Sequence, residues 1–134
     1  MNALLDTNIL ISIAASDETT PDLSDFDSLF VSSLTWNELT LGTHQVKALQ
    51  EYKRRAARIQ ALKKTLGRGL PFDDDCDEMY DELLVRVGQR SGTPKAHRFD
   101  RMIAATAMAH ELVLVTRNID DFKIFEGMLD VVER

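Results

Sequence analysis

The sequence predicts a single α/β domain in which helices cover both faces of a central, mainly parallel β-sheet. A chain of 134 residues suits one hydrophobic core, and strand-sized apolar runs alternate with helical segments along it. These runs are continuously apolar, which is typical of strands buried on both faces. With 44% hydrophobic and 28% charged residues, the composition is that of a folded protein. We therefore treat residues 1–134 as one domain.

The amino-terminal half alternates strand signals with helix signals. We expect strands at residues 3–5 and 29–31, each followed by a helix, at residues 7–15 and 34–43. Ser32 and Ser33 are suitable caps for the second of these helices, and Pro21 marks the loop between the two units. A third, amphipathic helix is predicted over residues 46–66 and ends at Gly67.

The carboxyl-terminal half repeats the alternation. Residues 70–72 are expected to form a short edge strand, because the proline among them cannot donate within a central ladder. Residues 73–90 predict a helix with acidic residues in its first turn, where the helix dipole favours them. A last helix over residues 98–111 precedes a strongly apolar strand at residues 112–115.

A local basic patch contrasts with the net charge of −6, which argues against nucleic-acid binding by bulk electrostatics alone. The patch lies in and beside the third predicted helix. Its members are Lys47, Lys53, Arg54, Arg55, Arg58, Lys63, Lys64 and Arg68. It is either a contact surface for RNA or a solvated helix face whose long side chains cover apolar surface.

The apolar runs, the first residues and the single cysteine all indicate a cytoplasmic protein. The longest apolar runs are strand-sized, and the first residues lack a basic leader and a signal-peptide apolar region. The lone Cys76 has no internal disulfide partner and lies among acidic residues, which disfavour a low thiol pKa. We expect a cytoplasmic protein with an inert thiol and no membrane association.

Asp6 and Glu38 are the first two candidate site residues. Asp6 follows an apolar strand, where it can cap the next helix or face a ligand beyond the sheet edge. Glu38 has Leu34 and Leu41 as helical neighbours, which places a carboxylate on the apolar stripe of its helix. Neither acid has an evident basic partner in the sequence.

Asp100 repeats this pattern on the last predicted helix. The residues that share its helical face are Ile103, Ala104 and Ala107. An isolated buried carboxylate costs several kcal/mol, so each acid needs a base, a proton or a metal ion. Arg98 or Arg101 can serve Asp100 as a structural ion pair. Several hard oxygen ligands without matched bases instead suit Mg²⁺ or Mn²⁺.

Signals for other kinds of site are absent from the sequence. The three histidines, His44, His97 and His110, lack metal-ligand spacing, and the single cysteine adds no ligand pair, so a zinc site is not expected. There is also no phosphate-binding P-loop, no dinucleotide-binding glycine motif and no Gly-x-Ser-x-Gly nucleophile elbow. The carboxylates remain the candidates for chemistry.

Four motifs follow one another along the chain. They are Leu-Leu-Asp-Thr-Asn at 4–8, Ser-Ser-Leu-Thr-Trp-Asn-Glu-Leu at 32–39 with Gly42, Phe-Asp-Arg-Met-Ile-Ala-Ala at 99–105, and Val-Thr-Arg-Asn-Ile-Asp-Asp-Phe at 115–122. In this order they resemble the PIN-domain family, specifically the ribonuclease toxins of bacterial VapBC-type toxin–antitoxin pairs. The resemblance covers essentially the whole chain, and the four motifs together are far more specific than any one of them.

The resemblance implies a PIN-like fold and a Mg²⁺-dependent endoribonuclease in which Mn²⁺ can substitute. The implied catalytic residues are Asp6, Glu38, Asp100 and Asp121, the implied metal ligands are Asp6, Glu38, Asp100 and Asn118, and the implied substrate-positioning residues are Thr7, Asn8 and Thr116. Whether Asn118 or Asp121 completes the site stays open. The two threonine hydroxyls can equally satisfy backbone groups at the strand ends. A cognate VapB-like antitoxin, an RNA substrate and a homodimer are also implied.

Two other functions compete with this one. A phosphatase of the haloacid dehalogenase type also begins with a strand that ends in Asp, but it needs a second Asp where this chain has Asn8. A non-catalytic module can keep the PIN fold and bind RNA or a protein, although the three retained acids argue against loss of catalysis.

Overall fold

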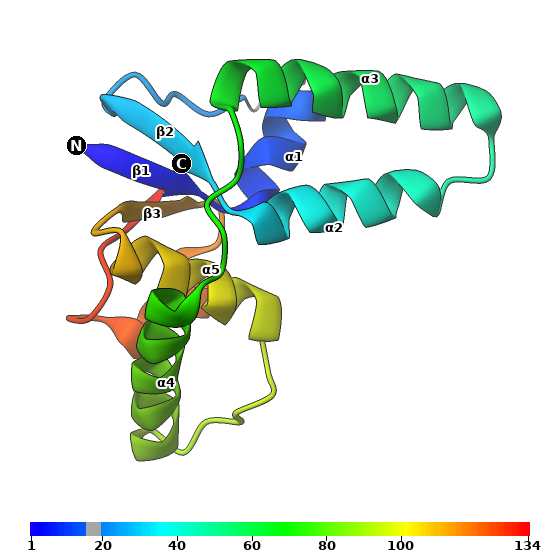
Figure 1. Cartoon of the computed structure of the whole chain (residues 1–134). Coiled ribbons are helices and arrows are strands. Elements are labelled where there is room, and N and C mark those ends of the chain that lie inside the picture. The colour runs from blue at the N-terminus through cyan, green and yellow to red at the C-terminus, as the bar shows by residue number, and fades with distance from the viewer. Residues whose placement is uncertain (16–19) are drawn as a thin grey trace.

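The computed structural model describes residues 1–15 and 20–134 and contains a four-stranded sheet (Figure 1). Its strands are β1 (Asn2–Leu5), β2 (Ser28–Val31), β3 (Val113–Thr116) and β4 (Val131–Glu133). They lie in the order β2-β1-β3-β4, and each neighbouring pair is parallel. The predicted parallel sheet is confirmed, and β4 is an edge strand that the apolar pattern does not predict.

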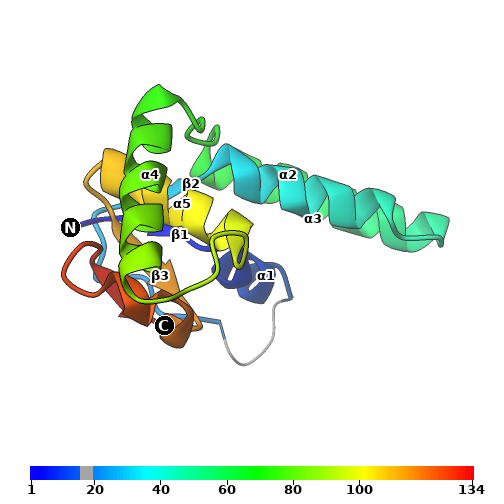
Figure 2. The same cartoon turned by 90° about the horizontal axis from the view of Figure 1, so that it is seen from below.

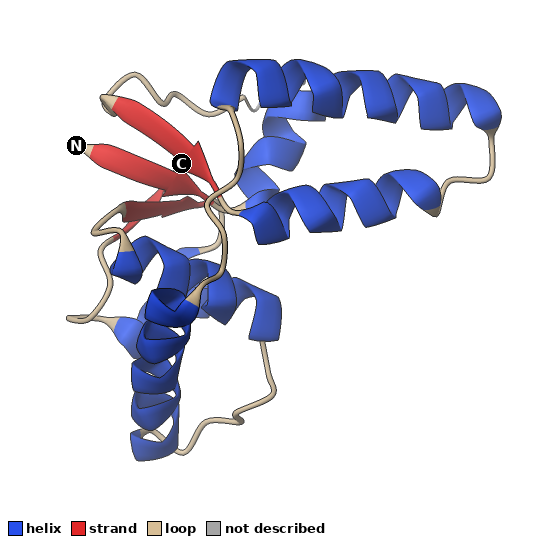
Figure 3. Cartoon of the chain, in the orientation of Figure 1, coloured by secondary structure: helices blue, strands red, loops and turns tan. Residues whose placement is uncertain are grey.

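Helices cover both faces of the sheet (Figure 3). One layer consists of α1 (Thr7–Ala15), α2 (Ser33–His44) and α3 (Leu49–Leu66), and the other of α4 (Asp74–Gln89), α5 (Arg98–Ala109) and the 3-10 segment η1 (Ile119–Phe125). Leu5 and Val115 face the first layer, whereas Leu4 and Leu114 face the second. The strands are therefore buried on both faces, which explains their continuous apolar sequences. No helix in the described ranges is both long and apolar enough to cross a membrane.

The helix ends follow the local sequence. Ser32 caps α2 by accepting a hydrogen bond from the Leu34 backbone N–H at 3.1 Å, and Asp73 caps α4 by accepting one from Cys76 at 3.1 Å. Gly67 ends α3 with a φ of +81°, a left-handed conformation that favours glycine. Cys76 is buried, and burial raises the pKa of its thiol. The expectation of a thiol without a low pKa is thus confirmed.

The edge strand expected at residues 70–72 is wrong in extent. Only Leu70 pairs with the sheet, through a single parallel bridge to Ser32. Leu70 donates from its N–H to the Val31 carbonyl at 2.8 Å and accepts at its carbonyl from the Ser33 N–H at 2.9 Å. The next residue is Pro71, which has no N–H with which to extend the ladder.

The helices α2 and α3 form a hairpin that projects from the rest of the molecule (Figure 2). At its base, Gly69 passes so close to α2 that a Cβ there would lie 2.5 Å from the Ser33 backbone nitrogen. Leu41 in α2 is 57% exposed. The prediction that Leu41 and Glu38 share an apolar stripe is therefore wrong for the leucine: Leu41 faces solvent, whereas Thr43 farther along α2 is buried.

Candidate functional site

The carboxyl ends of β1, β2 and β3 bring distant parts of the sequence together. Leu5 is in register with Val31 of β2 and with Val115 of β3, and the Asp6 N–H donates to the Val115 carbonyl at 2.8 Å. The chain leaves β1 toward β2 on one side and later returns to β3 on the other. Such a reversal of strand order opens a crevice beyond the strand ends, where ligands bind in parallel sheets.

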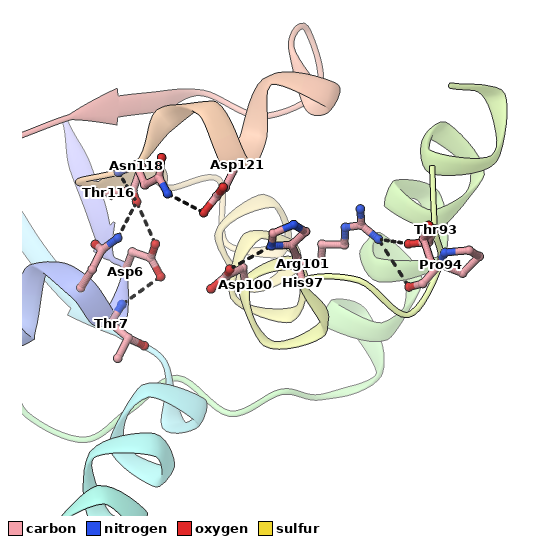
Figure 4. A network of polar contacts seen from close by, with 11 residues as sticks. Asp6, Thr7, Thr93, Pro94, His97, Asp100, Arg101, Thr116, Asn118 and Asp121 are labelled. Carbon is pink, nitrogen blue, oxygen red and sulfur yellow. Dashed lines mark hydrogen bonds and ion pairs between the residues drawn. The ribbon is translucent and has the colours of Figure 1, made fainter. Parts of the chain in front are cut away.

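Asp6 lies at this edge of the sheet, directly after β1, and is only 3% exposed. Its Oδ1 accepts a hydrogen bond from the Thr7 backbone N–H at 2.9 Å, and its Oδ2 accepts one from the Thr116 hydroxyl at 2.8 Å (Figure 4). Burial raises the pKa of the Asp6 carboxyl to about 6, and the negative charges of Asp100 and Glu38 also raise it. The two hydrogen bonds act in the opposite direction but do not outweigh burial.

Glu38 reaches the same crevice from α2. Its Oε1 accepts a hydrogen bond from the Thr7 hydroxyl at 3.1 Å, and the Thr35 hydroxyl lies 3.0 Å from that of Thr7. Burial raises the pKa of Glu38, and the charge of Asp100 adds to this effect. Thr35 is fully buried and supports the network. Sequence reasoning missed it, because a threonine within a helix carries no distinguishing signal.

Asp100 stands in the first turn of α5, and its predicted helical neighbours are all fully buried: Ile103, Ala104 and Ala107. Burial raises the pKa of Asp100, the charge of Asp121 raises it further, and His97 partly lowers it. The ion pair considered with Arg98 or Arg101 does not occur within the described ranges. Arg101 instead donates to the carbonyl oxygens of Thr93 at 2.8 Å and Pro94 at 3.4 Å.

Asp121 and His97 complete the acidic site around Asp100. One potential ligand atom from each of these three residues lies within 4.8 Å of the other two. Asp6, which directly follows β1, faces a common region with Asp100 of α5 and Asp121 of η1 (Figure 4). The Asn118 amide donates to Asp121 Oδ2 at 2.8 Å, so in this structure Asn118 orients Asp121. The spacing of the histidines gave no sign of this neighbour, yet the chain places His97 beside Asp100.

The three candidate substrate-positioning residues contact the acids and strand ends. Thr7 contacts Glu38, and Thr116 donates to Asp6. The Asn8 amide donates to the Thr116 hydroxyl at 3.2 Å, while its carbonyl oxygen accepts from the Arg117 N–H at 3.2 Å. The observed contacts of these side chains therefore fix the directions in which the carboxylates point.

The donor set fits a divalent cation. In residues 1–15 and 20–134, no Lys or Arg forms an ion pair with Asp6, Glu38 or Asp100. Burial raises the pKa of all three carboxyls. The charge of Asp100 adds to the rise at Asp6 and Glu38, and the charge of Asp121 adds to the rise at Asp100. Hard oxygen ligands with uncompensated charge are those that Mg²⁺ and Mn²⁺ prefer.

A groove lined by residues of α1, α2 and α3 shares Glu38 with the acidic site. It has a volume of about 400 Å³, and Thr7, Glu38, Arg55 and Arg58 are among its lining residues. All eight members of the basic patch are exposed. Within the described residues, Glu51 is the acid that pairs with this patch, through Arg54 and through Arg55, the latter at 2.9 Å. The lining of the groove therefore combines Glu38 of the acidic site with Arg55 and Arg58 of the basic patch.

Comparison of the sequence with protein families and curated proteins gives consistent matches. The PIN domain model matches residues 3–127. The protein named Ribonuclease VapC1 from Rickettsia felis is 28% identical over 128 residues, which are 96% of this chain and 93% of the relative. Toxin FitB from Neisseria gonorrhoeae is 29% identical over 129 residues, with 89% of each chain covered.

Solved structures resemble the chain over nearly its whole length. The VapBC2 complex from Rickettsia felis, bound to a promoter DNA fragment, includes a chain with a TM-score of 0.82 and 24% identity, and the match covers 100% of this chain and 99% of that one. For the FitAcB structure from Neisseria gonorrhoeae the TM-score is 0.81 and the identity 24%, with 98% and 96% covered. These likenesses establish the fold.

Proposed function

The chain belongs to the PIN-domain family, and on this premise we propose that it is a cytoplasmic, Mg²⁺-dependent endoribonuclease that acts as the toxin of a toxin–antitoxin pair. The observation that carries the proposal is the convergence of Asp6, Glu38 and Asp100: the charge of Asp100 raises the pKa of the other two, and none of the three has a Lys or Arg partner among the described residues. The relatives named ribonuclease and toxin support it.

The carboxylates of Asp6, Glu38, Asp100 and Asp121 would hold the metal and the attacking water. A bound Mg²⁺ or Mn²⁺ lowers the pKa of that water and stabilises negative charge on the phosphoryl oxygens. The water oxygen bonds to phosphorus while the bond from phosphorus to the 3′ oxygen breaks, which leaves 5′-phosphate and 3′-hydroxyl ends. Glu38 uses Oε1 to accept from Thr7, so its Oε2 is the atom we assign to take the proton of the water.

The residues around the acids act by orientation. Thr7 and Thr116 each hold a carboxylate oxygen, and Asn8 holds Thr116 in turn. Because metal coordination depends on ligand direction, such supporting contacts contribute to affinity without touching the ion. Asn118 has the same role for Asp121, which is why we assign the fourth acidic position to Asp121.

The groove offers a binding path for RNA and for the protein that controls the enzyme. Arg55 and Arg58 can neutralise phosphates of an RNA whose scissile bond lies near Glu38. We propose that a cognate antitoxin covers the same groove and places a basic side chain or a steric block at the acids. A homodimer is the expected assembly of the free toxin.

Nuclease assays test the catalytic part of the proposal. The purified chain should cleave RNA with Mg²⁺ or Mn²⁺, stop with EDTA and lose most activity as Asp100→Asn. The matched control is Asp120→Asn, which removes an exposed acid paired with Lys123 at 2.8 Å. RNA binding without cleavage would favour the non-catalytic module. Rapid hydrolysis of a chromogenic phosphomonoester would favour the phosphatase.

Growth assays test the toxin part. Expression of the chain alone should arrest bacterial growth, and co-expression of the protein encoded next to it should restore growth. Asp100→Asn should be harmless at equal protein level. If this variant remained as toxic as the wild type, nuclease activity at the acidic site would be the wrong explanation of toxicity.

A further inference from the structure

The loop before α5 delivers His97 to the acidic site in a fixed position. Arg101 is 6% exposed, and its guanidinium donates to the carbonyl oxygens of Thr93 and Pro94 and stacks over the Phe125 ring at 5.9 Å. The Thr93 carbonyl also accepts from the Ala96 N–H at 3.2 Å. A buried cation therefore anchors the turn that leads directly to the histidine (Figure 4).

The backbone of His97 has an unusual conformation that its surroundings maintain. Its φ of +52° lies in the left-handed region, which is uncommon for residues other than glycine. Its carbonyl accepts the hydrogen bond from the Arg101 N–H at 2.9 Å that begins α5. Non-glycine residues held in this region cost free energy and cluster at functional sites. Here the conformation directs the imidazole toward Asp100.

The imidazole and two carboxylates share one small region. His97 Nδ1 lies 3.7 Å from Asp100 Oδ2, and the ligand atoms of His97, Asp100 and Asp121 are mutually within 4.8 Å. The other two histidines lie elsewhere: His44 packs its ring against Tyr52, and His110 is the carboxyl-terminal cap of α5. In the described part of the chain, His97 is thus the histidine available to this site.

From this arrangement we propose that His97 is a nitrogen ligand of the metal site and gives the site a preference for Mn²⁺ over Mg²⁺. The inference rests on the proposed function, because it assumes that the acids bind a divalent cation. Mg²⁺ is bound almost entirely by oxygen, whereas first-row transition metals accept imidazole nitrogen readily. A site of carboxylates plus one imidazole therefore gains affinity for Mn²⁺ that it does not gain for Mg²⁺.

A simple ion pair between His97 and Asp100 predicts the opposite effect of removing the imidazole. A protonated histidine beside Asp100 competes with a metal cation for the carboxylate, so its loss strengthens metal binding. A ligand histidine contributes a donor atom, so its loss weakens binding. The variant His97→Gln keeps a polar side chain of similar length and distinguishes the two roles by sign.

The experiment measures Mn²⁺ and Mg²⁺ binding by calorimetry and records pulsed EPR spectra of the Mn²⁺-loaded, full-length chain. We expect nitrogen modulation in the wild type and in the control His110→Gln, and its loss in His97→Gln. Mn²⁺ affinity of His97→Gln should fall about tenfold, the lower end of the loss seen when a supporting contact of a metal site is removed. Its Mg²⁺ affinity should change much less. Circular dichroism checks that each variant is folded.

Two results would overturn the inference in distinguishable ways. Wild-type spectra without nitrogen modulation, or unchanged or tighter Mn²⁺ binding by His97→Gln, would remove His97 as a ligand and leave the carboxylate site intact. Wild-type Mn²⁺ affinity in Asp100→Asn would instead remove the proposed metal site, and the nitrogen ligand with it.

Discussion

The acidic site and the basic face of α3 carry opposite charges and differ in how their side chains are held. Asp6 is nearly inaccessible, each of its oxygens accepts a hydrogen bond, and burial raises its pKa. The basic residues of α3 are all exposed, and the helix has no fully buried residue. The acids are therefore fixed at a cost to the folded state, whereas the bases remain adjustable.

If the proposed function is right, this difference matches two kinds of ligand. A metal ion requires donor atoms at set distances and directions, which a pre-oriented carboxylate cluster supplies. A flexible RNA backbone presents repeated charges, and long mobile side chains on a helix can follow them. A single substitution in the acidic site should then cause a large loss of activity. Substitutions on α3 should weaken RNA binding in proportion to the charge they remove.

The largest expected effect is on catalysis by the acids. Asp6→Asn should lower kcat/KM by about 100-fold or more, the scale on which loss of one pre-organised electrostatic contact acts. Steady-state cleavage of a fluorogenic RNA measures it, with exposed Asp120→Asn as the control. Similar losses of kcat/KM in Asp6→Asn and Asp120→Asn would mean that activity depends no more on the buried acid than on an exposed one.

The second effect concerns pH and the stability of the metal-free chain. The pKa of Asp6 rises from 3.8 to about 6 on folding, so the folded state binds the extra proton between these values. Metal-free stability should therefore fall as pH rises through this interval, by at most about 3 kcal/mol from this group. Urea unfolding with EDTA at several pH values should show the stability of Asp6→Asn, relative to wild type, increasing over this interval. A constant difference would contradict the pKa assigned to Asp6.

The third effect concerns RNA binding and tests whether the basic residues of α3 contribute to it additively. Reversing Arg55 and Arg58 to Glu, in the Asp100→Asn background to prevent cleavage, should weaken RNA binding about tenfold or more. The slope of log affinity against log salt should shrink by about 1.4, since each lost contact to single-stranded phosphate contributes about 0.7. Fluorescence anisotropy measures both quantities. Exposed Arg90→Glu should leave the slope unchanged, and an unchanged slope in the double variant would make α3 an ordinary solvated face.

The smallest effect is on thermal stability without metal. The net rise in the pKa of Asp100 means that its charge destabilises the fold, through burial and repulsion by Asp121. The Asp100 side chain is 37% exposed, so solvent screens much of this effect, and Asp100→Asn should raise the metal-free Tm by about a few degrees at most. Calorimetry in EDTA tests this. Added Mg²⁺ should raise the wild-type Tm more than that of the variant. A sharply lower metal-free Tm in the variant would identify Asp100 as part of a structural ion pair.

Sequence patterns predicted the sheet and most helices because burial leaves a regular signature. Continuous apolar runs indicated strands covered on both faces, and Asp100 was found because it interrupts the helical face of Ile103 and Ala104. Glu38 was found by the same reasoning, although Leu41 beside it is exposed. Asp6 depended on its place at a strand end.

The parts that sequence reasoning missed depend on backbone geometry. The position of His97 follows from one left-handed residue and from the guanidinium of Arg101 bound to carbonyl oxygens, and neither is visible in residue spacing. The same contacts explain why Arg101 is no partner of Asp100. The roles of Asn118 and Asp121 were likewise undecided until their side chains were seen to bond to each other.

The bridge between Ser32 and Leu70 joins the two ends of the α2–α3 hairpin at its base. The polypeptide enters it at Ser33 and returns at Gly69, whose missing side chain allows the two segments to touch. An insertion or deletion of whole helical turns at the far end would leave that junction, Glu38 near the start of α2 and the acids outside the hairpin where they are. The length of the α2–α3 hairpin can therefore change without moving the acidic site.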